Sequence, residues 1–288
     1  MVRLELSTEL GYDIGEHGAD FIFNVQAAHT PRQTVVSEQL HLSQDSPYSE
    51  YTDPATNSRF LRLHAEAGWL TLRYTALVDL AHVEALPEQL MELDSYNLPG
   101  EVLPYLYPSR YCQSDRLLTL VSQEFGHLPL GYSRASAICN WVGQHVQFQS
   151  NTSSSATSAL DTLIERVGVC RDFAHLMIAL CRAANLPARI ASGIDYGADP
   201  ALGPLDFHAY VEVFLGDRWY MFDPSGTAIP MGFVRFATGR DAADIAFATI
   251  YGNVNPAQPI IDIQAVSNAH GQLVVPQHVG HALSTDGP

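Results

Sequence analysis

Three residues of the chain, Cys170, His208 and Asp223, have the side-chain types of a thiol-dependent acyl-transfer site. A thiolate attacks an acyl carbon, a histidine moves the proton, and a carboxylate orients the imidazole and stabilises its charged form. Each residue alone also has an ordinary structural interpretation: a small buried thiol, a core histidine or an acid at the end of a strand. The elements that position these residues decide between the two interpretations.

Cys170 lies at the start of a predicted helix over residues 170–184. In the first turn of a helix, free backbone N–H groups and the positive end of the dipole stabilise a thiolate. Cys181, in the middle of the same helix, has no such activation, and Gly168 allows a tight entry or a close approach of substrate. Apolar residues at three- and four-residue spacing define the buried face of the helix: Phe173, Met177, Leu180, Cys181 and Ala184.

His208 and Asp223 lie on the two strands of a predicted hairpin. Residues 205–215 alternate between two faces, Gly216-Asp217 is a turn dipeptide, and residues 218–223 are rich in strand formers. A two-residue loop places Tyr210 opposite Asp223, so His208 and Asp223 become diagonal neighbours at roughly 7–8 Å between backbones. A slip of one residue would turn Asp223 to the opposite face.

The rest of the chain shows a β-rich part followed by a helical part. Alternation over residues 20–81 predicts an antiparallel sheet. Prolines and glycines between residues 87 and 108 predict a connector, so we divide the chain into a β-rich N-terminal region (1–93) and a catalytic domain (94–288). Beyond Asp223 we expect a largely irregular C-terminal segment. The further predicted helices cover residues 116–125, a stretch beginning at 133, and 159–167.

The composition indicates a folded protein that does not bind nucleic acid. The chain has 288 residues, 47% of them hydrophobic and 16% charged. Its 31 acidic and 15 basic residues give a net charge of −16, and the basic residues form no cluster. Because binding to phosphates requires clustered cations, nucleic acid and anionic membrane surfaces are disfavoured as partners.

The N-terminal residues lack the apolar run of a signal peptide, and no segment has 18 consecutive apolar residues. We therefore expect a cytoplasmic protein. The four cysteines include no C-x-x-C pair, so neither a disulfide framework nor a zinc ribbon is predicted.

Four ordered motifs resemble the transglutaminase-like superfamily, which includes bacterial cysteine enzymes with the order Cys, His, Asp. The strong resemblance covers residues 133–225, about a third of the chain. The motifs are RVGVCRDFAH (166–175), NLPAR (185–189) followed by Ser192-Gly193, FHAYVEV (207–213) and WYMFDP (219–224).

This resemblance implies an α+β fold with a papain-like or transglutaminase-like core, in which the cysteine helix packs on an antiparallel sheet. It makes Cys170 the nucleophile, His208 the acid–base group and Asp223 the orienting acid. It also implies a peptide or protein substrate and no cofactor. No acidic cluster matches the calcium sites of animal transglutaminases, so calcium dependence does not carry over.

Several further residues are candidates for substrate contact. In this family a second oxyanion donor lies upstream of the nucleophile, and the candidates are Trp141, Gln144 and Gln147. Further substrate-binding candidates are Arg171, Asp172 and Tyr210, although Asp172 also suits the helix N-terminus. His175, five residues after Cys170, lies about 140° around the helix and is expected to pack elsewhere.

Two other functions use the same three residues. The first is a non-catalytic peptide-binding module on the same fold, although such copies usually lose a triad member. The second is a zinc site, because thiolate, imidazole and carboxylate all bind zinc. For an enzyme, both hydrolysis and transfer to an amine are open.

Overall fold

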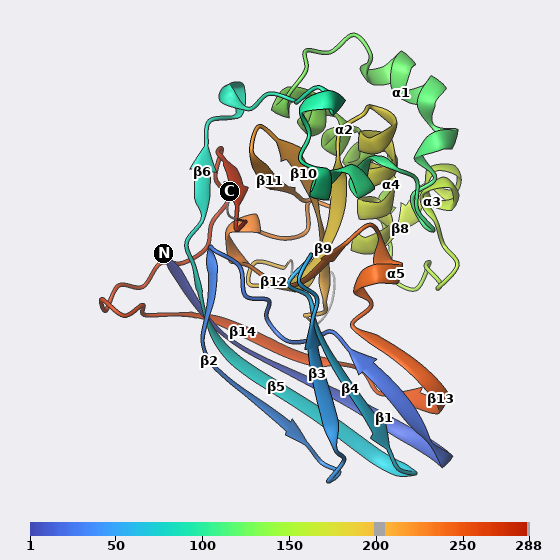
Figure 1. The fold of residues 1–288 in the computed structure, drawn as a ribbon, viewed down its shortest axis with the longest axis vertical. Helices are drawn as coiled ribbons and strands as arrows, with labels where there is room; N and C mark the ends of the chain where they lie inside the picture. The colour runs from blue at the N-terminus through green and yellow to red at the C-terminus, as the bar shows by residue number, and fades with distance from the viewer. Residues whose placement is uncertain (199–204, 287–288) are drawn as a thin grey trace.

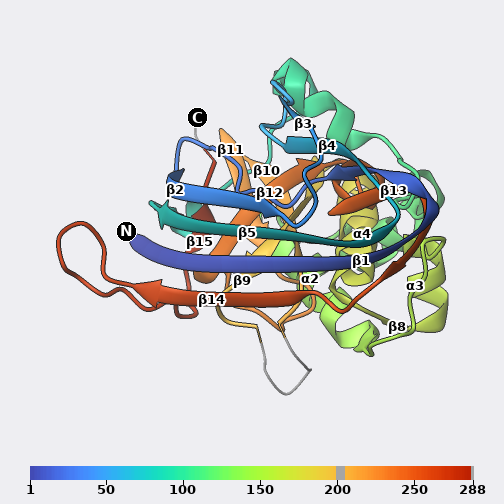
Figure 2. The same cartoon turned by 90° about the horizontal axis from the view of Figure 1, so that it is seen from below.

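The longest strand, β1 (Val2–Phe23), runs through the centre of a curved antiparallel sheet (Figures 1 and 2). The computed structural model describes residues 1–198 and 205–286. Alternate residues of β1, including Leu4, Leu6 and Leu10, are buried on one face, while polar neighbours lie on the other. Because side chains of a strand alternate between its two faces, the sheet has one apolar face that packs against the rest of the protein. Its other strands are β2 (Gln33–Leu42), β3 (Tyr48–Thr52), β4 (Arg59–Ala65), β5 (Gly68–Leu80), β13 (Ala248–Pro256) and β14 (Ile260–Val266).

The first half of β1 lies between β5 and β14, and its second half lies between β4 and β13. A register irregularity between Ile14 and Ala19 separates the two halves on the β13 side. The predicted sheet over residues 20–81 is present, but the sequence pattern missed the first half of β1.

The expectation of a largely irregular C-terminal segment is wrong. Residues after Asp223 form four strands, and β13 and β14 complete the N-terminal sheet from the far end of the chain. That sheet is thus not built from residues 1–93 alone. The strand β13 escaped prediction because its side chains remain at least partly exposed, so its sequence lacks a clear apolar alternation. The additional strands after Asp223 are β12 (Phe233–Gly239) and β15 (Ala282–Ser284).

A second antiparallel sheet, with strand order β11-β10-β9-β12, carries the helices. Its long helix α4 packs against β9 and β10, so the predicted α+β core is confirmed (Figure 1). The other strands of this sheet are β9 (Ala188–Asp195), β10 (His208–Leu215) and β11 (Arg218–Phe222). The helices are α1 (Leu118–Phe125), α2 (Tyr132–His145), α3 (Ala159–Glu165), α4 (Cys170–Ala183) and α5 (Ala242–Ile245). Two small pairings complete the fold: β6 (Val83–Ala85) with β15, and β7 (Gln147–Phe148) with β8 (Val167–Gly168).

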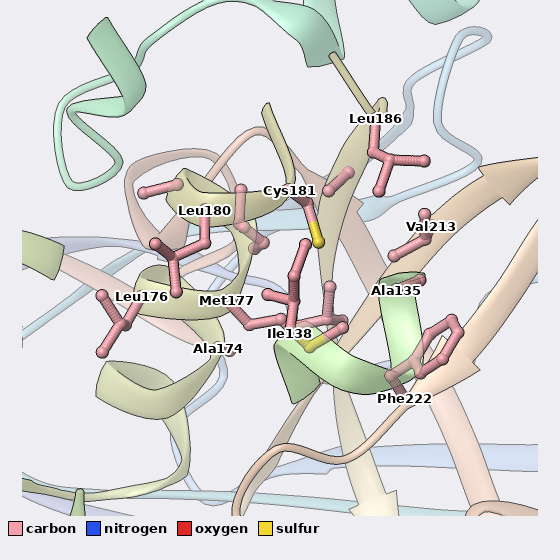
Figure 3. Close-up of a cluster of buried hydrophobic side chains, with 14 of the residues drawn as sticks. Ala135, Ile138, Ala174, Leu176, Met177, Leu180, Cys181, Leu186, Val213 and Phe222 are labelled. Atoms are coloured by element: carbon pink, nitrogen blue, oxygen red, sulfur yellow. The ribbon is translucent and has the colours of Figure 1, made fainter. Parts of the chain in front are cut away.

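The apolar face of α4 fills the space between α2 and the second sheet. Met177, Leu180 and Cys181 are fully buried there, next to Ile138 of α2 and Val213 of β10 (Figure 3). Burying a side chain of this size stabilises the fold by about 1.5–3 kcal/mol. The helix that begins at Cys170 is therefore held rigidly against the sheet. None of the described helices has both the length and the apolar character needed to cross a membrane.

A buried group of charges joins the strands of the second sheet. Glu212 on β10 is fully buried; its carboxylate accepts a hydrogen bond from Nε of Arg189 on β9 at 2.7 Å and pairs with Arg235 on β12. Asp286 near the C-terminus also pairs with Arg189. The Arg189 guanidinium lies 4.3 Å from the centre of the Trp219 ring. Three strands and the C-terminal residues thus share one ion network.

We expect Glu212→Gln to lower the free energy of unfolding by about 3–5 kcal/mol, because it leaves two buried guanidinium groups with too little negative charge. Urea denaturation measures the change. The matched control is Asp217→Asn, where the carboxylate is 64% exposed beside Arg218 and the expected loss is below about 1 kcal/mol. Equal losses in the two variants would contradict the importance of the buried network.

Candidate active site

Cys170 is the first residue of α4 and is partly exposed. The helix end is fixed by Asp172, whose Oδ2 accepts the backbone N–H of Val169 at 2.9 Å. A Cβ atom at Gly168 would lie 2.7 Å from Cβ of Asp172, so the close packing of this end requires glycine. The thiol is thereby placed at the positive end of the helix dipole.

His208 is the first residue of β10, and its side chain is only 7% exposed. It pairs with Gly193 of β9, where a Cβ atom would lie 1.9 Å from the carbonyl oxygen of Val234. Glycine at 193 therefore lets β9 and β12 come together behind the histidine. The Cys170 Sγ atom lies 3.9 Å from the carbonyl oxygen of Phe207, the residue before His208. The thiol at the start of α4 therefore lies beside the backbone that leads into β10 and His208.

The hairpin has the predicted register, with Phe214 opposite Trp219 and Val211 opposite Phe222. Asp223 follows the second strand directly, and its Oδ1 atom lies 3.5 Å from Nε2 of His208. This distance is at the limit of a hydrogen bond. Within the described residues Nε2 has no hydrogen-bond partner, so its contact with Asp223 is a charge pair.

The Asp223 carboxylate is held by the loop that follows it. Its Oδ1 accepts the Ser225 N–H at 3.0 Å and the Ser225 hydroxyl at 2.6 Å, and its Oδ2 accepts the Ala228 N–H at 3.0 Å. Three donors therefore fix the orientation of the carboxylate toward the imidazole.

The charges of the site shift the pKa values of His208 and Asp223 in opposite directions. Burial alone lowers the pKa of His208, but Asp223 and Cys170 raise it, and the net pKa lies well above 6.5. Burial alone raises the pKa of Asp223, but His208, Ser225 and the Ala228 N–H lower it, and the net pKa lies below its usual range. Both shifts favour a charged pair of imidazolium and carboxylate beside the thiol.

The oxyanion candidates lie at the end of α2 and in β7. Trp141 stacks on His145 with ring centres 3.8 Å apart, and Gln144 and Gln147 are exposed. Within residues 1–198 and 205–286, none of these candidates forms a hydrogen bond with Cys170 or His208.

The other candidates differ in their access to solvent. Arg171 is partly exposed and donates hydrogen bonds to Ser153 and, at 2.8 Å, to the carbonyl oxygen of Ser154, so it holds the loop beside Cys170. Asp172 and Tyr210 are completely buried. Their burial argues against the expected direct contact with substrate, because Asp172 caps α4 and the Tyr210 hydroxyl donates to Asp195 at 2.6 Å.

His175 packs away from the thiol, in agreement with its predicted position on the helix. Its ring stacks on Tyr111 with centres 5.0 Å apart, and its Nε2 accepts the Ala242 N–H at 3.1 Å. Burial lowers the pKa of His175 to about 3, so the ring is neutral at physiological pH.

Sequence reasoning missed Asp195, a buried acid at the end of β9. The alternation of the strand places it on the same face as Gly193, the partner of His208. Only the pairing of β9 with β10 brings Asp195 near the site. The connection between these two strands is long, so the sequence alone does not predict which residues of the strands lie opposite each other. Among the described residues, no group of three or more His, Cys, Asp or Glu side chains is arranged to hold a metal ion.

Comparisons with known proteins agree with this architecture. Residues 121–224 match the family model described as "Transglutaminase-like superfamily", and residues 2–97 match "Bacterial transglutaminase, N-terminal domain". A crystal structure of a protein from Cytophaga hutchinsonii, described as a putative cysteine protease, is 36% identical. The alignment covers 98% of this chain and 97% of that chain, with a TM-score of 0.90. An uncharacterised protein from Mycobacterium leprae is 26% identical over 85% of this chain and 91% of the relative.

We expect His208 to titrate with a midpoint above its usual value of about 6.5 and Asp223→Asn to lower that midpoint by about 1–3 pH units. The raised pKa means that His208 contributes stability that is complete below the unfolded pKa and is lost as the pH rises through the folded pKa. NMR spectra of the protein labelled with ¹⁵N in its histidines measure the midpoint. A midpoint at or below the usual value would contradict the charged pair.

Proposed function

Because the chain belongs to the transglutaminase-like superfamily, we propose that it is a thiol-dependent acyl-transfer enzyme that cleaves or exchanges amide bonds of peptides or proteins. One observation carries the proposal: the Cys170 thiol, at a helix N-terminus, lies 3.9 Å from the carbonyl oxygen of the residue before His208, whose Nε2 lies 3.5 Å from Asp223. The similar protein from Cytophaga hutchinsonii, described as a putative cysteine protease, supports the same class of reaction.

The proposed reaction has two steps. In the first, the Cys170 thiolate attacks the amide carbonyl carbon, the C–N bond breaks, and the imidazolium of His208 gives its proton to the departing amine. In the second, water or an acceptor amine attacks the thioester carbon and gives a proton to His208. The C–S bond breaks, and the Cys170 thiolate and the imidazolium are restored. With Nε2 directed to Asp223, Nδ1 is the ring nitrogen left to exchange protons with the thiol and the substrate. The Cys170 N–H is the natural first donor to the oxyanion.

Asp223 acts in this scheme by stabilising the imidazolium and fixing the ring orientation. Its three donors from Ser225 and Ala228 prevent the carboxylate from rotating away. The buried position of the pair strengthens the attraction, because the local dielectric constant is below that of water.

The peptide or protein substrate that we propose follows from the family, and the acidic sequence disfavours the other partners. With a net charge of −16 and no cluster of basic residues, the chain suits a peptide or protein substrate better than nucleic acid or an anionic membrane. A cytoplasmic location is part of the same proposal.

Two alternatives make different demands on the same residues. A peptide-binding module would not need the charged pair, and the retention of thiol, imidazole and carboxylate favours an enzyme. A zinc site would make any activity depend on the metal, which a chelator tests directly.

We expect iodoacetamide at neutral pH to alkylate Cys170 at least about tenfold faster than the other cysteines. Burial raises the pKa values of Cys112 and Cys139 to about 12 and also raises that of Cys181, so these thiols stay protonated. Peptide mapping after limited labelling measures the order. His208→Ala should slow the labelling of Cys170 alone, and equal labelling of Cys139 in the native protein would remove the case for a nucleophile.

We expect Asp223→Asn to reduce kcat/KM by about two to four orders of magnitude, or about 3–5 kcal/mol of transition-state stabilisation, because the amide cannot stabilise the imidazolium. Asp223→Ala should behave similarly. In combination with His208→Ala, either change should reduce kcat/KM little further, because the effects of substituting residues that act as a unit are not additive. Turnover of a peptide library, scored for both hydrolysis and amine incorporation, provides the assay.

The control for this substitution is Asp217→Asn, which removes an exposed carboxylate from the hairpin turn and should leave kcat/KM unchanged. The same assay with EDTA should show full activity in the native protein, whereas loss with EDTA and rescue by zinc would favour the zinc site. Near-normal turnover by Asp223→Asn, with unchanged melting, would show that this carboxylate does not orient the imidazole.

A further inference from the structure

Asp195 is a buried acid whose position the proposed reaction does not yet explain. Its side chain is 1% exposed, and in the described part of the chain it forms no ion pair with a lysine, arginine or histidine. Its Oδ2 accepts the Tyr210 hydroxyl at 2.6 Å, and its Oδ1 accepts the N–H groups of Gly197 at 2.6 Å and Ile229 at 3.2 Å. A buried carboxylate without a cation is costly, so its place in the fold requires an explanation.

The Tyr210 ring connects Asp195 to the catalytic histidine. The ring meets the His208 imidazole edge to face, with centres 4.8 Å apart and planes at 67°. His208 and Tyr210 pair with Gly193 and Ala191 of β9, so these side chains and Asp195 lie on one face of the two strands. The negative charge of Asp195 therefore lies just behind the group that becomes positively charged.

Asp195 and Asp223 also hold adjacent amides of one loop. The Ala228 N–H donates to Asp223 at 3.0 Å, and the Ile229 N–H donates to Asp195 at 3.2 Å. Because the two donors are neighbours in sequence, Asp195 anchors the same loop that fixes the orientation of Asp223.

We propose that Asp195 is a second carboxylate of the catalytic apparatus, a positioning residue that stabilises the imidazolium of His208 and anchors the loop that orients Asp223. This inference rests on the proposed function. Burial raises the pKa of Asp195, and the Tyr210 hydroxyl and the charge of His208 oppose that rise. Burial and Asp195 both raise the pKa of Tyr210, so its hydroxyl remains a donor.

The other charged groups near His208 have different partners from Asp195. Arg235 of β12, the other strand that pairs with β9, forms an ion pair with Glu212. Asp206, which precedes β10, is exposed to solvent. The pKa of Cys139 on α2 is raised by burial and by the charge of Asp223. Within the described ranges, the titratable groups that interact with the imidazole include Cys170 from α4, Asp223 after β11, Tyr210 on β10 and Asp195 on β9.

The test measures the NMR titration midpoint of His208 in the full chain carrying Asp195→Asn. Removing a negative charge disfavours the imidazolium, so we expect the midpoint to fall by about one pH unit. The alkaline limb of the pH dependence of kcat/KM should move to lower pH by the same amount. The matched control is Asp241→Asn, a buried carboxylate that accepts the Tyr111 N–H at 2.8 Å and lies beside His175 instead. It should leave the His208 midpoint unchanged even if the melting temperature falls.

Tyr210→Phe provides a second variant that keeps the ring against His208 and removes only the hydroxyl. We expect a smaller shift in the same direction, and this variant decides the question if Asp195→Asn does not fold. An unchanged midpoint in the folded variants, or an equal shift in Asp241→Asn, would overturn the role of Asp195. Selective labelling of Cys170 in the native protein tests the proposed function separately, so the two failures are distinguishable.

Discussion

The contact on which the site depends is the charge pair between His208 and Asp223, 3.5 Å apart in a buried position. It exists only in one register of the β10–β11 hairpin, because a slip of one residue would place Asp223 on the opposite face. The register is supported from both sides: Trp219 packs against Phe214 across the hairpin and against the Arg189 guanidinium of β9. The buried ion network around Glu212 is thus a structural support of the site, although it touches no reacting atom.

The N-terminal sheet contributes to the site through packing. Ile194, Val234 and Phe236 of the second sheet lie in the hydrophobic core of the first, so the two sheets share one core. The Phe236 ring meets Tyr74 of β5 on one side and Phe207 on the other, with centres 6.4 and 6.3 Å apart. The Phe207 carbonyl oxygen faces the thiol of Cys170. A continuous line of aromatic contacts therefore connects the N-terminal sheet to the residue before His208.

The local sequence pattern predicted the elements that carry the three central residues. The features that the sequence did not predict depend on pairing between strands that are far apart in the chain. The helix stripe after Cys170 and the Gly216-Asp217 turn are local signals. The helix α4 ends one residue before its predicted end, and the hairpin has the predicted register, although β10 begins three residues later than predicted. The place of Asp195 depends on the pairing of β9 with β10, and β13 and β14 depend on pairing with a strand more than 200 residues away. Tyr210 was correctly placed on the face of His208, but sequence could not show that the core covers it completely.

Burial gives the charges of this site their importance. It would by itself drive His208 toward the neutral form, and the same low dielectric increases the effect of each nearby negative group. One imidazole therefore lies near a thiol, a carboxylate at 3.5 Å and a second carboxylate that a tyrosine connects to it. A site with a single carboxylate would have to offset the whole desolvation cost of the imidazolium through one long contact. Distributing the negative charge over two strands and a shared loop lets the fold keep the histidine charged while the hydrophobic core excludes water around it.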